Sequence, residues 1–491
     1  EFRRVLFRSS RSFHAVKDSE YAPPASLQKT LRKYQRDGYR WLRTLDGYGM
    51  GGILADDMGL GKTVQVLSYL LAMKQNGQTL PSLIVCPASL VLNWAEECQK
   101  FTPELSCVVV DGDAAHRAEL AESWPAADLV VTSYDLLRRD EALYEGQEFY
   151  ACILDEAQAI KNHTTQKYKA VCKVRSRVRF ALTGTPVENR LGELWSIFSF
   201  LMPGYLPPYK SFCSRFEKPI VQEEDQTAVR RLNQLTGPFI LRRMKADVLK
   251  ELPPKTENVY RIELEEEQRK LYLAAVVDAR EKLQAAKPED KMAVFAVLMR
   301  LREICCDPRL IADNWEGGSA KLDACAELVS SAVEGGHRIL LFSQFTSMLE
   351  LLAKRLDAEG ISHFTLQGST PKPVRAELVR RFNGGEVSVF LISLRAGGTG
   401  LNLTAADIVI HYDPWWNVAA QNQATDRAYR IGQQNPVQVY KLIAQDTIEE
   451  KIVELQQAKQ SLADTVTGTA DGAILSMRPD ELLQLLEGSE P

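Results

Sequence analysis

Short apolar runs that end in loops of Gly, Pro, Ser, Asp or Thr recur along the chain in two groups. The runs are hydrophobic throughout and rich in β-branched residues, which is typical of strands buried on both faces of a parallel sheet. Segments 63–75 and 347–360 carry apolar residues at i, i+3 and i+4, which predicts helices between the strands. The predicted strands are 82–87, 105–112, 128–135, 151–157 and 178–186 in the first group, and 338–345, 362–368, 387–394, 407–413 and 437–443 in the second. This double alternation predicts an α/β protein with two doubly wound parallel-sheet lobes.

The segment between the two groups, residues 190–320, has a different pattern. It is rich in helical periodicity, proline and charge, so we expect helical insertions and a connector at 241–255. After residue 446 we expect a helix and then a polar tail, in which a short helix restarts at 478–486 with Pro479 in its first turn. The predicted organisation is a leader at 1–26, a first lobe at 27–238 with a helical insertion from about 190, a connector with a second insertion at 239–320, a second lobe at 321–445, and a helix with a tail at 446–491.

Composition narrows the class of protein. The chain has 491 residues, of which 45% are hydrophobic and 25% charged, as in ordinary globular proteins. No apolar run is long enough to span a membrane, so we expect no membrane partner. The net charge of −4 gives no global basic field, so a nucleic-acid partner would need a local basic cleft.

Cysteine and histidine usage argues against zinc. The nine cysteines are scattered without a C-x-x-C spacing, and the six histidines do not cluster. We therefore expect no zinc site and read the cysteines as reduced thiols, which indicates a cytoplasmic protein, associated with the nucleoid if it is bacterial.

The first nine residues, EFRRVLFRS, allow two interpretations. They are compatible with a basic targeting segment. They also match a conceptual translation of a common sequencing adapter, and we favour this second origin. We therefore expect the chain to begin inside a longer gene product.

A glycine-containing loop stands out at residues 59–63, GLGKT. Its glycines let backbone N–H groups turn toward phosphate oxygens, Lys62 can reach the β- and γ-phosphates, and the Thr63 hydroxyl can bind Mg²⁺. The strict pattern G-x-x-x-x-G-K-[ST] requires a glycine where this chain has Asp56. The alternative is a plain turn that enters a helix.

An acidic pair, Asp155 and Glu156, follows the apolar run of residues 151–154. A carboxylate at that position can hold Mg²⁺ beside a nucleotide, and its neighbour can orient or deprotonate the attacking water. We assign Asp155 to the metal and Glu156 to the water. By itself such a pair is common in solvated loops, but it is less common together with a Lys62-type loop in the same sheet.

Residues 417–433 read as a helix with Asn417 as N-cap and Gly432 at its end. Gln423, Arg427 and Arg430 then share one helix face. Arginines on one face are usually a solvated stripe. An arginine supplied by a second lobe can instead stabilise the charge on a γ-phosphate during hydrolysis.

These features occur together in a known family. Over roughly residues 27–465, the chain resembles the ATPase core of the SWI/SNF-type (sucrose non-fermenting) family of superfamily-2 helicase-like proteins, in its bacterial-type branch. The segments that carry the resemblance are LRKYQRDGYRWL (31–42), LADDMGLGKTVQ (54–65), LDEAQAIKN (154–162), LTGTPVENRLGELWSIFSFL (182–201), ILLFSQF (339–345), LISLRAGGTGLNLTAADIVIHYDPWWN (391–417) and QATDRAYRIGQ (423–433).

The resemblance implies RecA-like lobes with helical insertions, a C-terminal bracing helix, and ATP and Mg²⁺ as cofactors. It makes Gln35 the base-reading residue and Arg427 and Arg430 the arginine fingers. The family's phosphate loop does not require the first glycine, so Asp56 is compatible with it. The implied nucleotide contacts are Gln35, Asp57, Met58, Gly59, Leu60, Gly61, Lys62, Thr63, Gly400 and Gln423.

Some positions depart from the common family pattern. Gln158 stands where many relatives have histidine, and DEAQ resembles bacterial members. Asp307 also replaces a usual histidine, and Arg395 a usual lysine. None of the three touches the expected phosphate chemistry, but they affect what can be inferred about DNA contacts and lobe coupling.

The resemblance also implies a double-stranded DNA track across both lobes, with contacts to the backbone rather than to the bases. For the small hydroxyl residues the alternative is ordinary turn chemistry, and for the pair Trp415–Trp416 it is packing. The candidate contacts are Pro87, Ser89, Asn93, Thr132, Ser133, Tyr134, Gln367, Gly368, Ser393, Arg395, Gly397 and Trp416.

The sequence therefore predicts an ATP-dependent translocase on double-stranded DNA that displaces or remodels a DNA-bound protein, such as RNA polymerase or another nucleoprotein. Two alternatives stay open. One is a strand-separating helicase of the same superfamily. The other is a scaffold that uses ATP binding as a switch.

Overall fold

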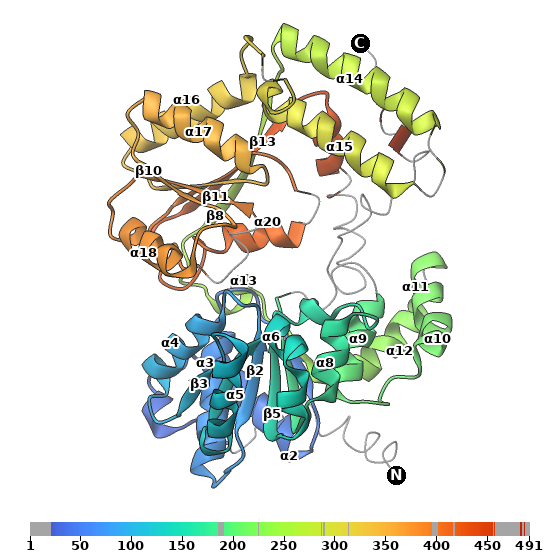
Figure 1. Cartoon of the computed structure of the whole chain (residues 1–491), viewed down its shortest axis with the longest axis vertical. Helices are drawn as coiled ribbons and strands as arrows, with labels where there is room; N and C mark the ends of the chain where they lie inside the picture. Colours follow the sequence, from blue (N-terminus) through green and yellow to red (C-terminus); the bar gives the residue numbers. More distant parts are fainter. Residues whose placement is uncertain are drawn as a thin grey trace. The chain divides into compact units, whose positions relative to one another are not determined.

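In the computed structural model the chain forms two compact units, with the sequence boundary between Lys250 and Glu251. Each unit is built on one sheet whose strands all run parallel (Figure 1). The structure describes residues 21–184, 191–223, 225–285, 287, 290–312, 314–394, 401–415, 418–454, 456, 482, 483 and 486.

The first unit contains a seven-stranded sheet in the order β3-β4-β2-β5-β6-β1-β7. Its central strands are almost completely buried, which explains their uninterrupted apolar sequences. The strands are β1 (Gly52–Leu54), β2 (Ser82–Cys86), β3 (Cys107–Val109), β4 (Leu129–Ser133), β5 (Glu148–Asp155), β6 (Arg175–Leu182) and β7 (Ile240–Leu241).

Helices connect these strands, and a helical insertion of α9 to α12 lies between β6 and β7. In Figure 1 the helices of the insertion gather at one side of the sheet. The helices of this unit are α2 (Lys33–Gly47), α3 (Lys62–Gln75), α4 (Val91–Phe101), α5 (Ala114–Ser123), α6 (Tyr134–Arg139), α7 (Glu141–Glu145), α8 (Gln166–Lys173), α9 (Leu191–Leu201), α10 (Tyr209–Phe212), α11 (Lys218–Gln222), α12 (Gln226–Thr236) and α13 (Lys245–Val248).

The second unit contains a six-stranded sheet in the order β10-β11-β9-β12-β13-β8. Its strands are β8 (Lys255–Ile262), β9 (Ile339–Ser343), β10 (His363–Leu366), β11 (Val389–Ser393), β12 (Ile408–His411) and β13 (Val437–Ala444). Its helices are α14 (Glu266–Ala285), α15 (Lys291–Cys306), α16 (Ala320–Glu334), α17 (Thr346–Ala358), α18 (Lys372–Asn383) and α20 (Val418–Thr425).

Both faces of this second sheet are apolar. On β9, Ile339 and Leu341 pack into a cluster with residues of α16 and α17, while Leu340 and Phe342 pack into a cluster on the opposite face. A third apolar cluster joins α14 and α15 to Ile448 and Ile452 of a helical stretch at 448–454. The helix expected after residue 446 is therefore present, and it packs on the helical insertion of its own unit.

The predicted fold class is confirmed, and each predicted strand coincides with an observed one. Three strands were missed. β1 and β7 are only three and two residues long. β8 is eight residues long but lies at the sheet edge, where all of its residues except Ile262 are exposed. A polar edge strand lacks the apolar run that identifies a buried parallel strand.

Two buried ion pairs connect helices of the second unit to segments at the ends of its strands. Lys321 of α16 pairs with Glu449, and both side chains are fully buried. Glu449 also accepts a hydrogen bond from the Ala444 N–H at the end of β13, 2.9 Å away. Arg302 of α15 pairs with Asp413, which follows β12, at 3.1 Å. Within the part of the chain that the structure describes, no helix is long and apolar enough to cross a membrane.

We expect Glu449→Ala to lower the free energy of unfolding by about 3–5 kcal/mol, because it leaves the Lys321 ammonium buried without its counter-charge. Glu450→Ala is the matched control, since the neighbouring Glu450 forms a surface pair with Arg261, and its cost should be less than about 1 kcal/mol. Urea unfolding followed by circular dichroism measures both. Equal effects of the two substitutions would show that the buried pair does not stabilise this unit.

Candidate functional site

The predicted phosphate loop lies between β1 and α3. Gly59 has φ 83° and Gly61 has φ 74°, conformations that favour glycine. The loop ends where α3 begins at Lys62, so the first N–H groups of that helix face the loop. An N-terminus of this kind favours a bound anion.

Helix α2 holds the loop from one side. The Tyr34 hydroxyl and the Gln35 amide nitrogen both donate to the Leu60 carbonyl, at 3.0 and 3.1 Å. A Cβ on Gly61 would come within 2.6 Å of that amide nitrogen, so the close packing requires glycine. Gln35 therefore lies directly against the loop, while its role in base reading stays a prediction.

Lys62 and Thr63 are both partly exposed at the start of α3. The Lys62 ammonium donates to the Asp56 carbonyl at 2.7 Å and lies 3.4 Å from the Asp57 carbonyl. It thus lies inside the loop, where a lysine can reach phosphate oxygens.

Asp56, the residue that breaks the strict glycine rule, is fully buried. Its carboxylate forms a two-pronged ion pair with Arg243, in which Nε and Oδ1 are 2.7 Å apart and Nη2 contacts Oδ2. Gln65 of α3 joins them, since its amide nitrogen donates to Asp56 at 3.1 Å and its amide oxygen accepts from Arg243 at 2.7 Å. Asp56 is therefore a structural anchor of the loop.

Backbone contacts also fasten the segment after β7 to the loop. The Asp57 N–H donates to the Arg243 carbonyl at 3.0 Å, and the Lys245 N–H donates to the Asp57 carboxylate at 2.9 Å. The Arg243 guanidinium also lies over the Tyr34 ring, 5.3 Å from its centroid. Sequence reasoning missed Arg243, because it lies 187 residues from Asp56 and no local spacing connects them.

Asp155 and Glu156 lie at the end of β5, which is separated from β1 only by β6 in the parallel sheet. The structure therefore brings the carboxylate pair and the Lys62 loop together near the carboxyl ends of the strands of one sheet. Burial and then the charge of Glu156 raise the pKa of Asp155 to about 7, whereas the nearby Lys62 ammonium lowers it. Two adjacent carboxylates suit a divalent cation, which prefers oxygen ligands. Among the described residues, no group of three or more His, Cys, Asp or Glu side chains gathers to hold a metal.

The Asp155 carboxylate is held by two donors. The Trp94 indole Nε1 donates to Oδ2 at 2.8 Å, and the Glu156 N–H donates to Oδ1 at 2.9 Å. The Tyr134 hydroxyl donates to the Asp155 carbonyl at 2.9 Å. Trp94 was not among the predicted site residues, because nothing in its spacing relates it to Asp155.

Glu156 has φ 49° and ψ 56°, a left-handed conformation that costs a non-glycine residue about 1–3 kcal/mol. Its carboxylate accepts a hydrogen bond from the Gln158 amide nitrogen at 2.7 Å. The Gln158 amide oxygen in turn accepts from the Thr183 hydroxyl at 3.1 Å. Gln158 can form this bridge because an amide offers a donor and an acceptor at once.

The predicted helix at 417–433 was wrong in its extent. α20 ends at Thr425, so Arg427 and Arg430 lie on a turn and do not share a helix face with Gln423. After Asp426 the backbone leaves the α-helical pattern, because the N–H groups of Arg427 and Ala428 donate to carbonyls only three residues back. The Leu403 N–H donates to the Arg427 carbonyl, and the Gln433 amide donates to the Ala428 carbonyl, which holds the turn. Asn417 lies outside the described residues.

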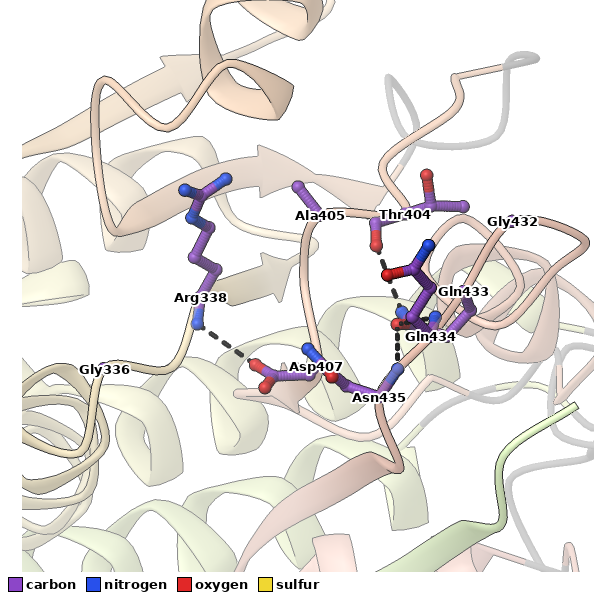
Figure 2. Close-up of a pocket in the computed structure, with 9 residues that line it drawn as sticks. All are labelled: Gly336, Arg338, Thr404, Ala405, Asp407, Gly432, Gln433, Gln434 and Asn435. Atoms are coloured by element: carbon purple, nitrogen blue, oxygen red, sulfur yellow. Dashed lines mark hydrogen bonds between the residues drawn. The ribbon is translucent and has the colours of Figure 1, made fainter.

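Gln433 organises this arginine turn. Besides the Ala428 carbonyl, its amide nitrogen donates to the carbonyls of Thr404 and Ala406, at 3.2 and 2.7 Å. Figure 2 shows Gln433 beside a cavity of about 340 Å³ that Arg338 and Asp407 also line. This cavity lies at the amino ends of β9 and β12, next to the arginine turn. Arg427 is buried in the turn, and Arg430 is partly exposed.

The candidate DNA contacts fall into three sets. Pro87, Ser89, Asn93 and Gln367 are partly exposed and Gly368 is exposed, all in segments that follow β2 and β10. Thr132, Ser133, Tyr134 and Ser393 are buried, and Ser133 caps α6 while Thr132 accepts a hydrogen bond from Tyr144. Arg395, Gly397 and Trp416 lie outside the described residues, as does Gly400, which was predicted to contact the nucleotide. DNA contact stays a prediction for all of the candidate DNA contacts.

Two further residues singled out in the sequence have structural roles. Asp307 is buried, caps the turn at Pro308–Leu310 and pairs with Arg309 at 2.7 Å. Trp415 packs against two apolar clusters and lies under the Arg302 guanidinium, which supports the packing interpretation.

Two family models match the chain. Residues 34–310 match the SNF2-related domain, and residues 320–432 match the helicase conserved C-terminal domain. The chain belongs to the SNF2-related family of helicase-like ATPases. Its predicted family and enzyme class are thereby confirmed.

Several SNF2-related proteins are similar over nearly the whole chain. An uncharacterized ATP-dependent helicase of Mycoplasma genitalium is 39% identical over 99% of this chain and 46% of its own length. The putative ATP-dependent helicase/translocase YwqA of Bacillus subtilis is 39% identical over 98% of this chain and 53% of its own length. The TATA-binding protein-associated factor MOT1 of Saccharomyces cerevisiae is 34% identical over 94% of this chain and 29% of its own length. The chain thus spans about half the length of the bacterial relatives.

A solved structure, the Sulfolobus solfataricus SWI2/SNF2 ATPase core in complex with dsDNA, is 36% identical. The match covers 92% of this chain and 96% of that one, with a TM-score of 0.46.

We expect Arg243→Met to lower the free energy of unfolding by about 3–5 kcal/mol, because it leaves the Asp56 carboxylate buried without its counter-charge. It should also raise the KM for ATP, since the loop loses its anchor. Arg242→Met is the control, because Arg242 is exposed next to it, and it should cost less than about 0.5 kcal/mol. Urea unfolding and steady-state ATPase kinetics measure both effects. An unchanged KM in Arg243→Met would show that the ion pair does not shape the phosphate site.

Proposed function

We propose that this SNF2-related chain is an ATP-dependent translocase on double-stranded DNA that displaces or remodels a DNA-bound protein. Hydrolysis of ATP to ADP and phosphate drives the movement. RNA polymerase and other nucleoproteins are the class of displaced partner that we expect.

The observation that carries the proposal is that the Lys62 loop and the Asp155–Glu156 pair lie together at the carboxyl ends of strands in one parallel sheet. Phosphoryl transfer needs little more from a protein than positioning and charge stabilisation, and these groups supply both. The second RecA-like unit adds the arginine turn at 426–432, which is the feature that would tie hydrolysis to movement between two lobes.

The residues divide the chemistry as follows. Lys62 and the N–H groups at the start of α3 bind the β- and γ-phosphates. The Thr63 hydroxyl and the Asp155 carboxylate would hold Mg²⁺, which neutralises phosphate charge when it is bound. Glu156, oriented by Gln158, takes the proton of the attacking water. Arg430, which is partly exposed, and Arg427, after a rearrangement that uncovers it, stabilise the charge on the γ-phosphate.

Two observations support double-stranded DNA with a bound protein as the substrate. The segments after β2 and β10 present small polar groups and backbone, which suit phosphate contact without base readout. The Bacillus relative is named as a putative helicase/translocase, and the yeast relative is named as a TATA-binding protein-associated factor. By analogy with these relatives, we propose that this chain acts on a protein bound to DNA.

We expect Lys62→Ala to abolish ATP hydrolysis and to retain most of the affinity for double-stranded DNA, because backbone phosphate contacts dominate that affinity. Lys74→Ala is the control, since Lys74 lies near the end of the same helix and forms a surface pair with Asp128. Phosphate release with and without DNA, and DNA binding by fluorescence anisotropy, measure both. Near-normal hydrolysis by Lys62→Ala would refute the site. In the unsubstituted protein, DNA-stimulated phosphate release no higher than background would favour the ATP-switched scaffold instead.

The same protein should displace a triplex-forming strand from duplex DNA in an ATP-dependent manner and should leave a plain duplex intact. Translocation along a duplex dislodges the third strand without opening base pairs, whereas a strand-separating helicase unwinds both substrates. Gel assays of the two substrates run side by side measure the difference. Unwinding of the plain duplex would favour the helicase alternative.

A further inference from the structure

Trp94 lies in α4 and is almost completely buried, yet its one polar atom forms a hydrogen bond at the carboxyl end of β5. The indole Nε1 donates to Asp155 Oδ2 over 2.8 Å, across 61 residues of sequence. The side chain is 1% exposed, so water does not compete for this hydrogen bond. A donor to a buried carboxylate is among the stronger hydrogen bonds in a protein.

The indole suits a carboxylate that must also bind a metal. It has a donor and no acceptor, and it does not titrate, so it orients Asp155 without attracting the cation itself. The second oxygen of Asp155 is oriented by the Glu156 N–H. With one donor on each oxygen, the rotation of the carboxylate is fixed and lone pairs remain for a ligand.

The position of α4 gives this hydrogen bond a second consequence. The segment before the helix contains Pro87 and Ser89, and its first turn contains Asn93, all of which are partly exposed candidate DNA contacts. Trp94 is the next residue after Asn93. A displacement of α4 by DNA would therefore move the donor that fixes Asp155.

We infer that Trp94 is a positioning residue that sets the Asp155 carboxylate for Mg²⁺ and links its orientation to the DNA-facing segment 87–93. The inference rests on the proposed function, because it assumes that Asp155 holds the metal and that this segment meets DNA. Outer-shell donors of this kind typically change metal affinity by about 10–100-fold when they are removed.

Trp94→Phe removes the donor and keeps an aromatic ring. Trp124→Phe is the matched control, because Trp124 is a fully buried tryptophan of the same unit whose Nε1 has no hydrogen-bond partner among the described residues. Equilibrium binding of a fluorescent ATP analogue, titrated with Mg²⁺, gives the half-saturating Mg²⁺ concentration. It should rise about 10–100-fold in Trp94→Phe and stay near the unsubstituted value in Trp124→Phe. Binding of the analogue in EDTA should be equal in the two variants. Equal Mg²⁺ dependence in the two variants would overturn the inference.

Double-stranded DNA tests the link to segment 87–93. It should lower the half-saturating Mg²⁺ concentration in the unsubstituted protein and in Trp124→Phe, but not in Trp94→Phe. An equal DNA effect in all three proteins would overturn the link. If DNA binds none of them, the proposed function fails, while the comparison of the two variants in Mg²⁺ alone still decides the role of Trp94.

A measurement on the unsubstituted chain covers the case in which Trp94→Phe does not fold. The chain has seven tryptophans, whose indole N–H groups can be observed by NMR after ¹⁵N labelling. The resonance of a hydrogen-bonded indole should shift when Mg²⁺ is added to the nucleotide-bound protein. If no indole resonance responds to Mg²⁺, Trp94 does not sense the metal.

Discussion

The first lobe depends on the buried ion pair between Asp56 and Arg243. It joins the loop after β1 to the segment after β7, and it thereby closes the edge of the seven-stranded sheet where these two strands pair. Gln65 of α3 contacts both members of the pair and Tyr34 of α2 contacts Arg243, so four parts of the lobe meet at one ion pair. This pair restrains the phosphate loop, because moving the carboxylate away would leave a buried charge without its partner.

The second lobe uses the same device. Asp413, after β12, pairs with Arg302 of the helical insertion and also accepts hydrogen bonds from Ser343 and the Gln344 N–H at the end of β9. In both lobes a carboxylate that follows a buried strand binds an arginine from a distant segment. The edge that carries the chemistry is thus stiffened by polar contacts, while the faces of each sheet are held by apolar packing.

The sequence was sufficient to predict elements and site residues that depend only on neighbouring residues. Apolar runs located the long buried strands, because a parallel sheet covered on both faces needs hydrophobic residues at every position. The same criterion failed for β8, whose polar residues are those of an edge strand. Asp155 and Glu156 could be found because they directly follow a strand, and Lys62 could be found because it belongs to a local glycine-containing motif. Trp94 and Arg243 could not, because their partners are 61 and 187 residues away and tertiary packing alone brings them together. The helix over 417–433 was overextended because its periodicity continues, whereas the backbone after Thr425 forms a turn that contacts of Gln433 and Leu403 hold in place.

The long sequence separation of Asp56 and Arg243 also affects how the protein is made. A ribosome that adds about 5–20 residues per second needs on the order of 10–40 s to synthesise the 187 residues between them. Late in that interval the nascent chain contains α3 and the strands up to β6, but it still lacks the Arg243 guanidinium that Asp56 requires for burial. The nucleotide site of the first lobe therefore forms late in synthesis, only after its helical insertion and β7 have emerged.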